Sequence, residues 1–191
     1  GLTIGYTVEL EGDADGTTTI DESSFSISGG FGKIVLGQND GAGDNYGFNS
    51  MDLIAEETGN IPGSATIGAS TDIPTMSDDN RKIAYHLPAM GGLTAGVSHT
   101  NSGATGATDT TEVGAKYVMD AGGNTITLNG SSATTEASST DTDAQSMGVT
   151  FVSGNLSLNF GQATYQALDE DQSTQGAAVS YKMSNGMTVG A

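Results

Sequence analysis

Apolar and polar residues alternate along most of the chain with the period of two that is typical of β-strands. Within 111–120, for example, Val113, Ala115, Tyr117 and Met119 share one face and alternate mainly with polar or small residues. No stretch of comparable length has the periodicity of a helix. The alternation predicts eleven strands, at about 2–11, 18–28, 31–38, 80–87, 92–100, 111–120, 124–132, 145–153, 155–165, 175–183 and from 187 onward.

Short and long connections alternate between the predicted strands. The short ones are tight turns built from residues that accept positive φ or begin turns, at 29–30, 88–91, 120–123, 153–154 and 184–186. The long ones are polar, at 12–17, 39–79, 101–110, 133–144 and 166–174. This order predicts an all-β fold, an antiparallel up-and-down meander with tight turns at one end and long loops at the other.

Aromatic residues occupy the apolar face shortly before five of the tight turns. A soluble core does not require aromatic rings at one height, whereas a membrane interface attracts them, because an aromatic ring with an apolar body sits well at the level of the lipid head groups. We therefore expect an aromatic belt at one membrane interface, formed by Phe25, Tyr85, Tyr117, Phe151 and Tyr181.

The composition leaves these apolar faces without a protein core to cover them. Only 35% of the residues are hydrophobic and 29 of 191 are glycine, a low apolar share for a globular domain. We therefore expect the apolar face to contact lipid and the polar face to line a wet interior. Strands cross hydrocarbon only as a closed barrel, because every backbone N–H and C=O must be paired. The predicted fold is a transmembrane β-barrel, of which 1–191 form part as a single domain.

A protein of a different class remains the alternative. Soluble β-sandwiches and β-solenoids are also rich in Gly, Thr and Ser, so the chain could be a structural or adhesive β-protein of the cell envelope without channel activity. Sandwich strands need not alternate short and long connections or align aromatic residues at one end. Both features favour the barrel.

The charge excludes several classes of function. Five basic residues against 23 acidic ones give a net charge of −18, which repels nucleic acids. The chain has no cysteine, and His86 and His99 have no partner histidine at metal spacing. No nucleophile, acid and base arrangement is recognisable, so we expect neither an enzyme nor a cofactor. The carboxylates of Asp13, Asp15 and 169–171 could bind calcium only weakly.

Three pieces of sequence resemble a known family. FGKIVLGQNDGAGDN (31–45), NRKIAYHLPAMGGLTAGVSHT (80–100) and the Gly-Ala-Lys-Tyr of 111–120 are similar to the general-diffusion porins of Gram-negative outer membranes, most of all the alphaproteobacterial ones. In that family a strand reading approximately F-G-K-L-x-L-G precedes the third external loop, which folds into the barrel and narrows the pore. A strand resembling R-x-Y-x-x-P-x-x-G-L follows it. The P-E-F-G-G motif of enterobacterial constriction loops is absent here.

The resemblance implies a homotrimer embedded in outer-membrane lipid. Each subunit would be a 16-stranded barrel through which small hydrophilic solutes and ions diffuse passively. The chain begins and ends inside strand patterns, so we expect it to be the middle of such a barrel and a segment of a longer protein.

By the same resemblance, residues 39–79 are an inward-folded constriction loop. Unstructured insertions of this length are usually functional or disordered. Residues 50–57 predict a short helix with Ser50 as its N-cap. Gly41-Ala42-Gly43 follows a strand but is expected to open no helix, which excludes a phosphate-binding loop. The loop carries eight acids and no base: Asp40, Asp44, Asp52, Glu56, Glu57, Asp72, Asp78 and Asp79.

Strand parity places all four lysines on inward faces, where water and acids can solvate them, and Arg81 on an outward face at a strand end. Any membrane barrel would show this segregation. We expect a basic pore wall of Lys33, Arg81, Lys82 and Lys116, opposed across the narrow zone by Asp40, Asp44, Asp52, Glu56 and Glu57. Because acids outnumber bases, the sequence predicts a weak preference for cations.

Overall fold

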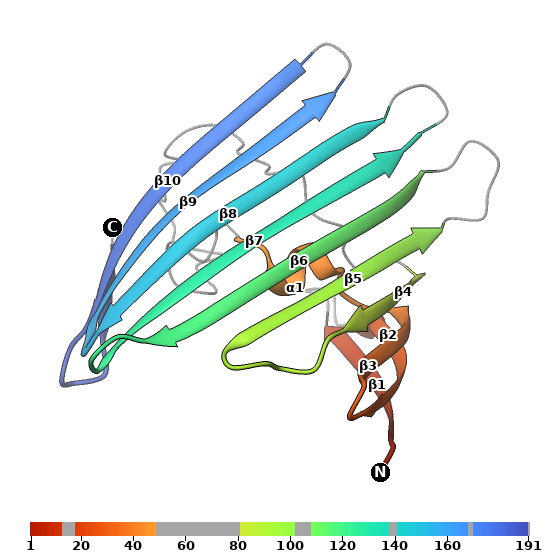
Figure 1. Ribbon diagram of the computed structural model, residues 1–191, viewed down its shortest axis with the longest axis horizontal. Coiled ribbons are helices and arrows are strands. Elements are labelled where there is room, and N and C mark those ends of the chain that lie inside the picture. The colour runs from red at the N-terminus through yellow and green to blue at the C-terminus, as the bar shows by residue number, and fades with distance from the viewer. Residues whose placement is uncertain (13–17, 49–80, 102–107, 138–140, 168–169, 191) are drawn as a thin grey trace.

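The computed structural model describes residues 1–12, 18–48, 81–101, 108–137, 141–167 and 170–190. In them, eleven strands form one curved antiparallel sheet in which each strand pairs with its neighbours in the chain, and β1 and β11 are the edges (Figure 1). The predicted all-β, up-and-down order is confirmed. The elements are β1 (Thr3–Gly12), β2 (Thr18–Gly29), β3 (Gly32–Gln38), α1 (Ala42–Tyr46), β4 (Arg81–His86), β5 (Leu93–Asn101), β6 (Asp109–Asp120), β7 (Asn124–Glu136), β8 (Thr142–Ser153), β9 (Leu156–Ala167), β10 (Glu170–Lys182) and β11 (Thr188–Gly190).

The two faces of the sheet differ in chemistry, as the alternation predicts. The outer face exposes large apolar side chains, among them Ile83 (50% exposed), Val113 (50%) and Phe160 (52%). The inner face carries mainly Ser, Thr, Asn, Ala and Gly, and α1 packs on it against β5, β6 and β7. Buried apolar residues of the described part are mostly alanines. An apolar face of this extent requires cover from outside the sheet.

Tight turns and long connections lie at opposite ends of the sheet. In Figure 1 the turns that join β6 to β7 and β8 to β9 lie at the lower left, and the opposite ends of these strands lie at the upper right. In the β6–β7 turn, Gly122 and Gly123 have φ values of 66° and 86°, which a residue with a Cβ rarely adopts. The five aromatic residues lie toward the turn end. Phe25, Tyr117 and Tyr181 are exposed there, and their role at a membrane interface stays a prediction.

Several strands extend further toward the long connections than the sequence predicts. β7 ends at Glu136 instead of 132, β8 begins at Thr142 instead of 145, and β10 begins at Glu170 instead of 175. The predicted loops 133–144 and 166–174 are therefore too long. Hydrogen-bonded polar pairs continue the ladder here, from the Thr110 to the Thr135 hydroxyl (3.0 Å) and from Thr134 Oγ1 to Asp143 Oδ1 (2.7 Å). Alternation fades because neither face needs to be apolar at this height.

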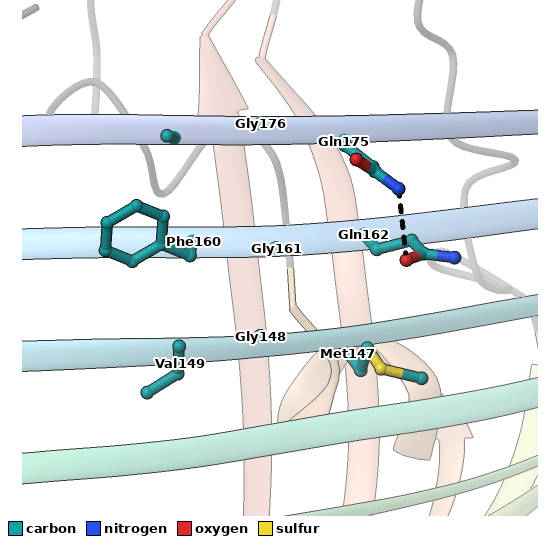
Figure 2. A pocket seen from close by; sticks show the side chains of 9 residues that line it. Met147, Gly148, Val149, Phe160, Gly161, Gln162, Gln175 and Gly176 are labelled. Carbon is teal, nitrogen blue, oxygen red and sulfur yellow. Dashed lines mark hydrogen bonds between the residues drawn. The ribbon is translucent and has the colours of Figure 1, made fainter.

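The outer face changes from apolar to polar within β8–β10. Figure 2 shows a shallow groove of about 650 Å³ there, between a row of side chains that includes Phe160 and a more polar row that includes Gln162 and Gln175. Gln175 Nε2 donates a hydrogen bond to Gln162 Oε1 at 3.4 Å. The two glutamines mark the upper edge of the apolar belt, by which we mean the band of apolar outer-face side chains. No helix among the described residues is long and apolar enough to cross a membrane.

A charge placed in the apolar belt should destabilise the barrel, whereas the same charge on the inner face should not. We expect Leu158→Arg to lower the free energy of unfolding of the full-length refolded protein by about 1 kcal/mol, the cost near a membrane interface, because Leu158 pairs with Phe151. Ser157→Arg, one position away but on the inner face, is the matched control and should change it by much less. Urea titrations followed by gel mobility measure both. Equal destabilisation by the two variants would contradict the assignment of the faces.

Candidate functional site

After β3 the chain turns back across the inner face of the sheet. Residues 39–48, here called the inward segment, contain α1 and pack against β5–β7 (Figure 1). Ala42 is fully buried and Phe48 is 5% exposed. The expectation that Gly41-Ala42-Gly43 opens no helix is wrong, because α1 begins at Ala42. A phosphate-binding loop is still not supported, because side chains of the sheet already accept hydrogen bonds from the first N–H groups of the helix.

A carboxylate and a hydroxyl from the wall cap the start of α1. Ala42 N donates to Ser98 Oγ (2.8 Å) and Gly43 N donates to Glu112 Oε2 (3.2 Å). Ser98 Oγ in turn donates to Glu112 Oε2 at 2.7 Å. Glu112 is fully buried. A carboxylate at the start of a helix is favourable, because the free N–H groups there carry partial positive charge.

Polar groups of the wall also hold the end of the inward segment. Phe48 N donates to Ser146 Oγ (2.9 Å), and Asn129 Nδ2 donates to the Gly47 carbonyl oxygen (2.8 Å). Ser131 lies within hydrogen-bond distance of Ser146, with 2.8 Å between the hydroxyl oxygens. These contacts join the segment to β7 and β8.

A tyrosine of α1 bonds to a histidine of β4. The Tyr46 hydroxyl is hydrogen-bonded to His86 Nδ1 at 2.7 Å, and the two ring centroids are 5.7 Å apart. Burial raises the pKa of the Tyr46 hydroxyl above its ordinary value. The phenol is protonated at neutral pH, and the tautomer of His86 decides which of the two groups donates the hydrogen bond.

Glycines at matched positions let the inward segment lie directly on the backbone of the wall. Gly96 and Gly114 are paired across β5 and β6 and lie under α1. Gly148 and Gly161 are paired across β8 and β9, and the Phe48 ring occupies the space that a Cβ at either would need. Figure 2 shows these two glycines side by side on their strands. Any side chain at these four positions would push the segment away from the wall.

The described residues place only part of the predicted site. Asp40 and Asp44 lie in the inward segment, half-buried and exposed respectively, whereas Asp52, Glu56 and Glu57 and the predicted helix 50–57 lie outside the described residues. Lys82 is 5% exposed. The opposition of acids and bases across a narrow zone stays a prediction. On the strands, Lys33 and Arg81 are exposed, and Lys116 is half-buried.

Sequence reasoning did not single out the residues that anchor the segment. Glu112, Ser98, Ser146 and Phe48 lie far apart in the chain, and each looks ordinary in its own strand or loop. One signal was present, because Glu112 is an acid on the inward face of a strand, and the next residue on that face is Gly114. Within the described part no group of three or more His, Asp or Glu side chains could hold a metal ion. The predicted calcium ligands Asp13, Asp15 and Asp169 lie outside it.

The geometry is that of a sheet with an apolar outer face and a chain segment docked on a polar inner face. A family model for Gram-negative porins matches residues 1–191. The chain belongs to the Gram-negative porin family. The resemblance stated from the sequence is thus confirmed at the level of the family, and membership places the protein in the outer membrane.

Two solved structures of outer-membrane proteins illustrate the shared fold. The chain is similar to an anion-selective porin from Comamonas acidovorans, with 21% sequence identity and a TM-score of 0.64 over 96% of this chain and 60% of that one. It is also similar to the in-vitro folded trimer form of the outer membrane protein OmpT of Vibrio cholerae, with 17% identity and a TM-score of 0.50 over 96% of this chain and 72% of that one. The comparison with curated proteins finds no match. The chain thus spans 60% of the length of the Comamonas porin.

Packing of Phe48 on the glycines of this porin wall predicts a strong coupling between them. Gly161→Ala should destabilise the full-length protein by about 1–3 kcal/mol, because the new methyl group overpacks against the Phe48 ring. In a Phe48→Ala background the same change should cost less than about 0.5 kcal/mol, since the ring is absent. A double-mutant cycle of unfolding free energies measures the coupling.

The control for this cycle is Gly130→Ala, on the outer face of β7 and directed away from the inward segment. It should show no coupling to Phe48. If Gly161→Ala costs the same with and without the Phe48 ring, the ring does not rest on β9.

Loss of the Glu112 carboxylate should release the start of α1. Glu112→Ala leaves the Gly43 N–H and the Ser98 hydroxyl without this acceptor, at a cost of about 1–3 kcal/mol, and Glu112→Gln should cost less because it keeps an acceptor oxygen. Amide hydrogen exchange of a peptide that covers 39–48 should therefore be fastest in the alanine variant. Thr110→Ala, on the same face of β6, is the control. Unchanged exchange in Glu112→Ala would rule out the anchoring role.

Proposed function

We propose that the protein is a water-filled channel through which small hydrophilic solutes and ions diffuse passively across the outer membrane. The observation that carries the proposal is the docking of the inward segment on a polar wall whose opposite face is apolar. A wall that is polar inside and apolar outside suits a pore in lipid. The segment, held at Glu112 and Ser146, narrows this pore. Membership of the porin family supports the same function.

In this proposal residues 39–79 form the constriction. The described part of the loop already lies inside the curve of the sheet and carries Asp40 and Asp44. Asp52, Glu56 and Glu57 follow in the same loop and extend its acidic character. The basic residues Lys33, Lys82 and Lys116 on the strands, with Arg81 at the start of β4, supply the opposite charge.

The channel prefers cations weakly. The similar porin from Comamonas acidovorans is anion-selective, but at 21% identity that likeness concerns the fold alone. The 23 acidic residues of this chain exceed its five basic ones, and the net charge is −18. Fixed negative charge near the permeation path concentrates cations there.

The working unit is a homotrimer in outer-membrane lipid. The trimer form of the Vibrio cholerae OmpT structure supports this assembly for a related fold, and the apolar belt supplies a surface for lipid. The channel needs no catalytic step and no cofactor. Neither the family nor the similar structures support the adhesive alternative.

The reversal potential across a planar bilayer tests the proposal. In a potassium chloride gradient the full-length protein should give step conductance with a modest preference for potassium. Asp40→Asn combined with Asp44→Asn should lower that preference about twofold, because two charges about 8 Å apart in water interact by about 0.5 kcal/mol. The control is Asp143→Asn, which removes one charge on the outer face of β8 and should leave the preference unchanged.

Three outcomes separate the parts of this proposal. Absence of step conductance contradicts the channel. Conductance with unchanged selectivity in the double variant leaves the channel standing and removes the inward segment from the ion path. An equal effect of Asp143→Asn would show that distant surface charge, and not the inward segment, determines selectivity.

A further inference from the structure

Acidic and basic side chains separate along the axis of the sheet. With the single exception of Asp120 in the β6–β7 turn, the described acids lie in the half of the sheet next to the long connections, on either side of the inward segment or on the strand ends above it. These acids are Glu9, Glu11, Asp21, Glu22, Asp40, Asp44, Asp109, Glu112, Glu136, Asp141, Asp143 and Asp171.

Three of the four lysines lie on the inner face in the half next to the tight turns. Lys33 is the second residue of β3 and pairs with His86, which bonds to the inward segment. Lys116 shares the face of β6 on which Gly114 meets α1. Lys182 ends β10 and shares the face of Gly176, the cross-strand partner of Gly161 beneath Phe48. All three therefore face the lumen on the turn side of the segment.

Little charge of either sign offsets this separation. The described inner-face positions of β7, β8 and β9 carry only Thr, Ser, Asn, Gly, Ala, Val and Tyr. Arg81 and Lys82 lie in the acidic half and reduce its charge without reversing it. Four of the twelve acids, Asp109, Glu136, Asp143 and Asp171, lie on the outer face, and the other eight still outnumber these two bases. Asp120 stands against three lysines in the other half. The described part of the lumen thus has a negative zone and a positive zone with the inward segment between them.

We propose that this channel rectifies current, passing more when the long-loop side is positive; the inference rests on the channel function proposed above. Cations carry the current in the acidic zone and anions carry it in the lysine zone. A positive potential on the long-loop side drives both toward the inward segment, where they accumulate and raise the conductance. The opposite potential draws both away from the segment and depletes it of carriers.

The effect depends on ionic strength in a defined way. Fixed charges act over about 10 Å at 0.1 M salt and over about 3 Å at 1 M salt. At 0.1 M salt the electric field of the fixed charges extends across a lumen of the size of a small solute. At 1 M salt mobile ions screen this field close to the wall. Rectification should therefore be clear in dilute salt and absent in concentrated salt, which separates it from a voltage-driven movement of the loop.

Current–voltage curves of full-length protein in symmetric potassium chloride test the proposal. The chain has no cysteine, so a single Thr108→Cys on the long-loop side, modified from one chamber by a membrane-impermeant bulky thiol reagent, reports the orientation of each channel. At 0.1 M salt and 100 mV the current should be roughly twofold larger with the long-loop side positive, and the ratio should fall to about one at 1 M.

Removal of the lysine zone supplies the decisive variant. Lys33→Gln combined with Lys116→Gln and Lys182→Gln should bring the ratio at 0.1 M close to one. Lys182→Gln alone, at an exposed strand end, should lower it partially and serves if the triple variant does not fold. Asp120→Asn, the matched change of opposite sign in the same half, should keep or raise the ratio.

The outcomes distinguish this inference from the function on which it rests. Linear curves at 0.1 M, or larger current of the opposite polarity, overturn the inference and leave the channel intact. Rectification that survives the loss of the lysines also overturns it. Absence of conductance in every salt contradicts the channel itself and the inference together.

Discussion

The contact of a chain segment with the bare backbone of its own wall is the constraint on which the interior of this porin depends. Gly148 and Gly161 leave room for the Phe48 ring, and Gly96 and Gly114 leave room for α1. The apolar side chains of the outer face point away from the segment. Only the inner-face residues of the strands therefore set how closely the segment can pack. In the proposed channel, the diameter of the lumen depends on how closely the segment approaches the strands, and glycine permits the closest approach.

The polarity of the wall matches the two ends of α1. A helix of five residues leaves nearly all of its N–H and C=O groups without partners inside the helix. At its start, Glu112 and Ser98 supply acceptors for N–H groups, and past its end Asn129 supplies a donor for the Gly47 carbonyl. The wall thus completes a helix that would be unstable alone. The fully buried carboxylate of Glu112 lies where the partial charge of the helix start favours it.

Alternation predicted the strands because one face of a membrane barrel contacts lipid and the other contacts water. Within the apolar belt, the polarity of each residue therefore indicates the face on which it lies. It failed at the long-loop ends of β7, β8 and β10, where both faces are wet and threonine pairs replace the apolar signal. The helix at Ala42 was missed for a different reason. Its capping groups come from Ser98 and Glu112, which are 56 and 69 residues away, and no local pattern reports them. The sequence therefore predicted the acidic character of the loop but not the residues that anchor it to the wall.

The same opposition of solvents also sorts the charges. A lysine cannot lie in the apolar belt, so the few bases of the strands are restricted to the lumen or to strand ends. Acids are under the same restriction, yet most are found on the extended strand ends and in the loops, where water surrounds both faces. At the height of the apolar belt, the inner-face lysines therefore supply most of the charge, although acids outnumber bases in the chain as a whole. An overall charge of −18 is thus compatible with the positive zone proposed for the lumen, and the net charge alone describes neither end of the proposed channel.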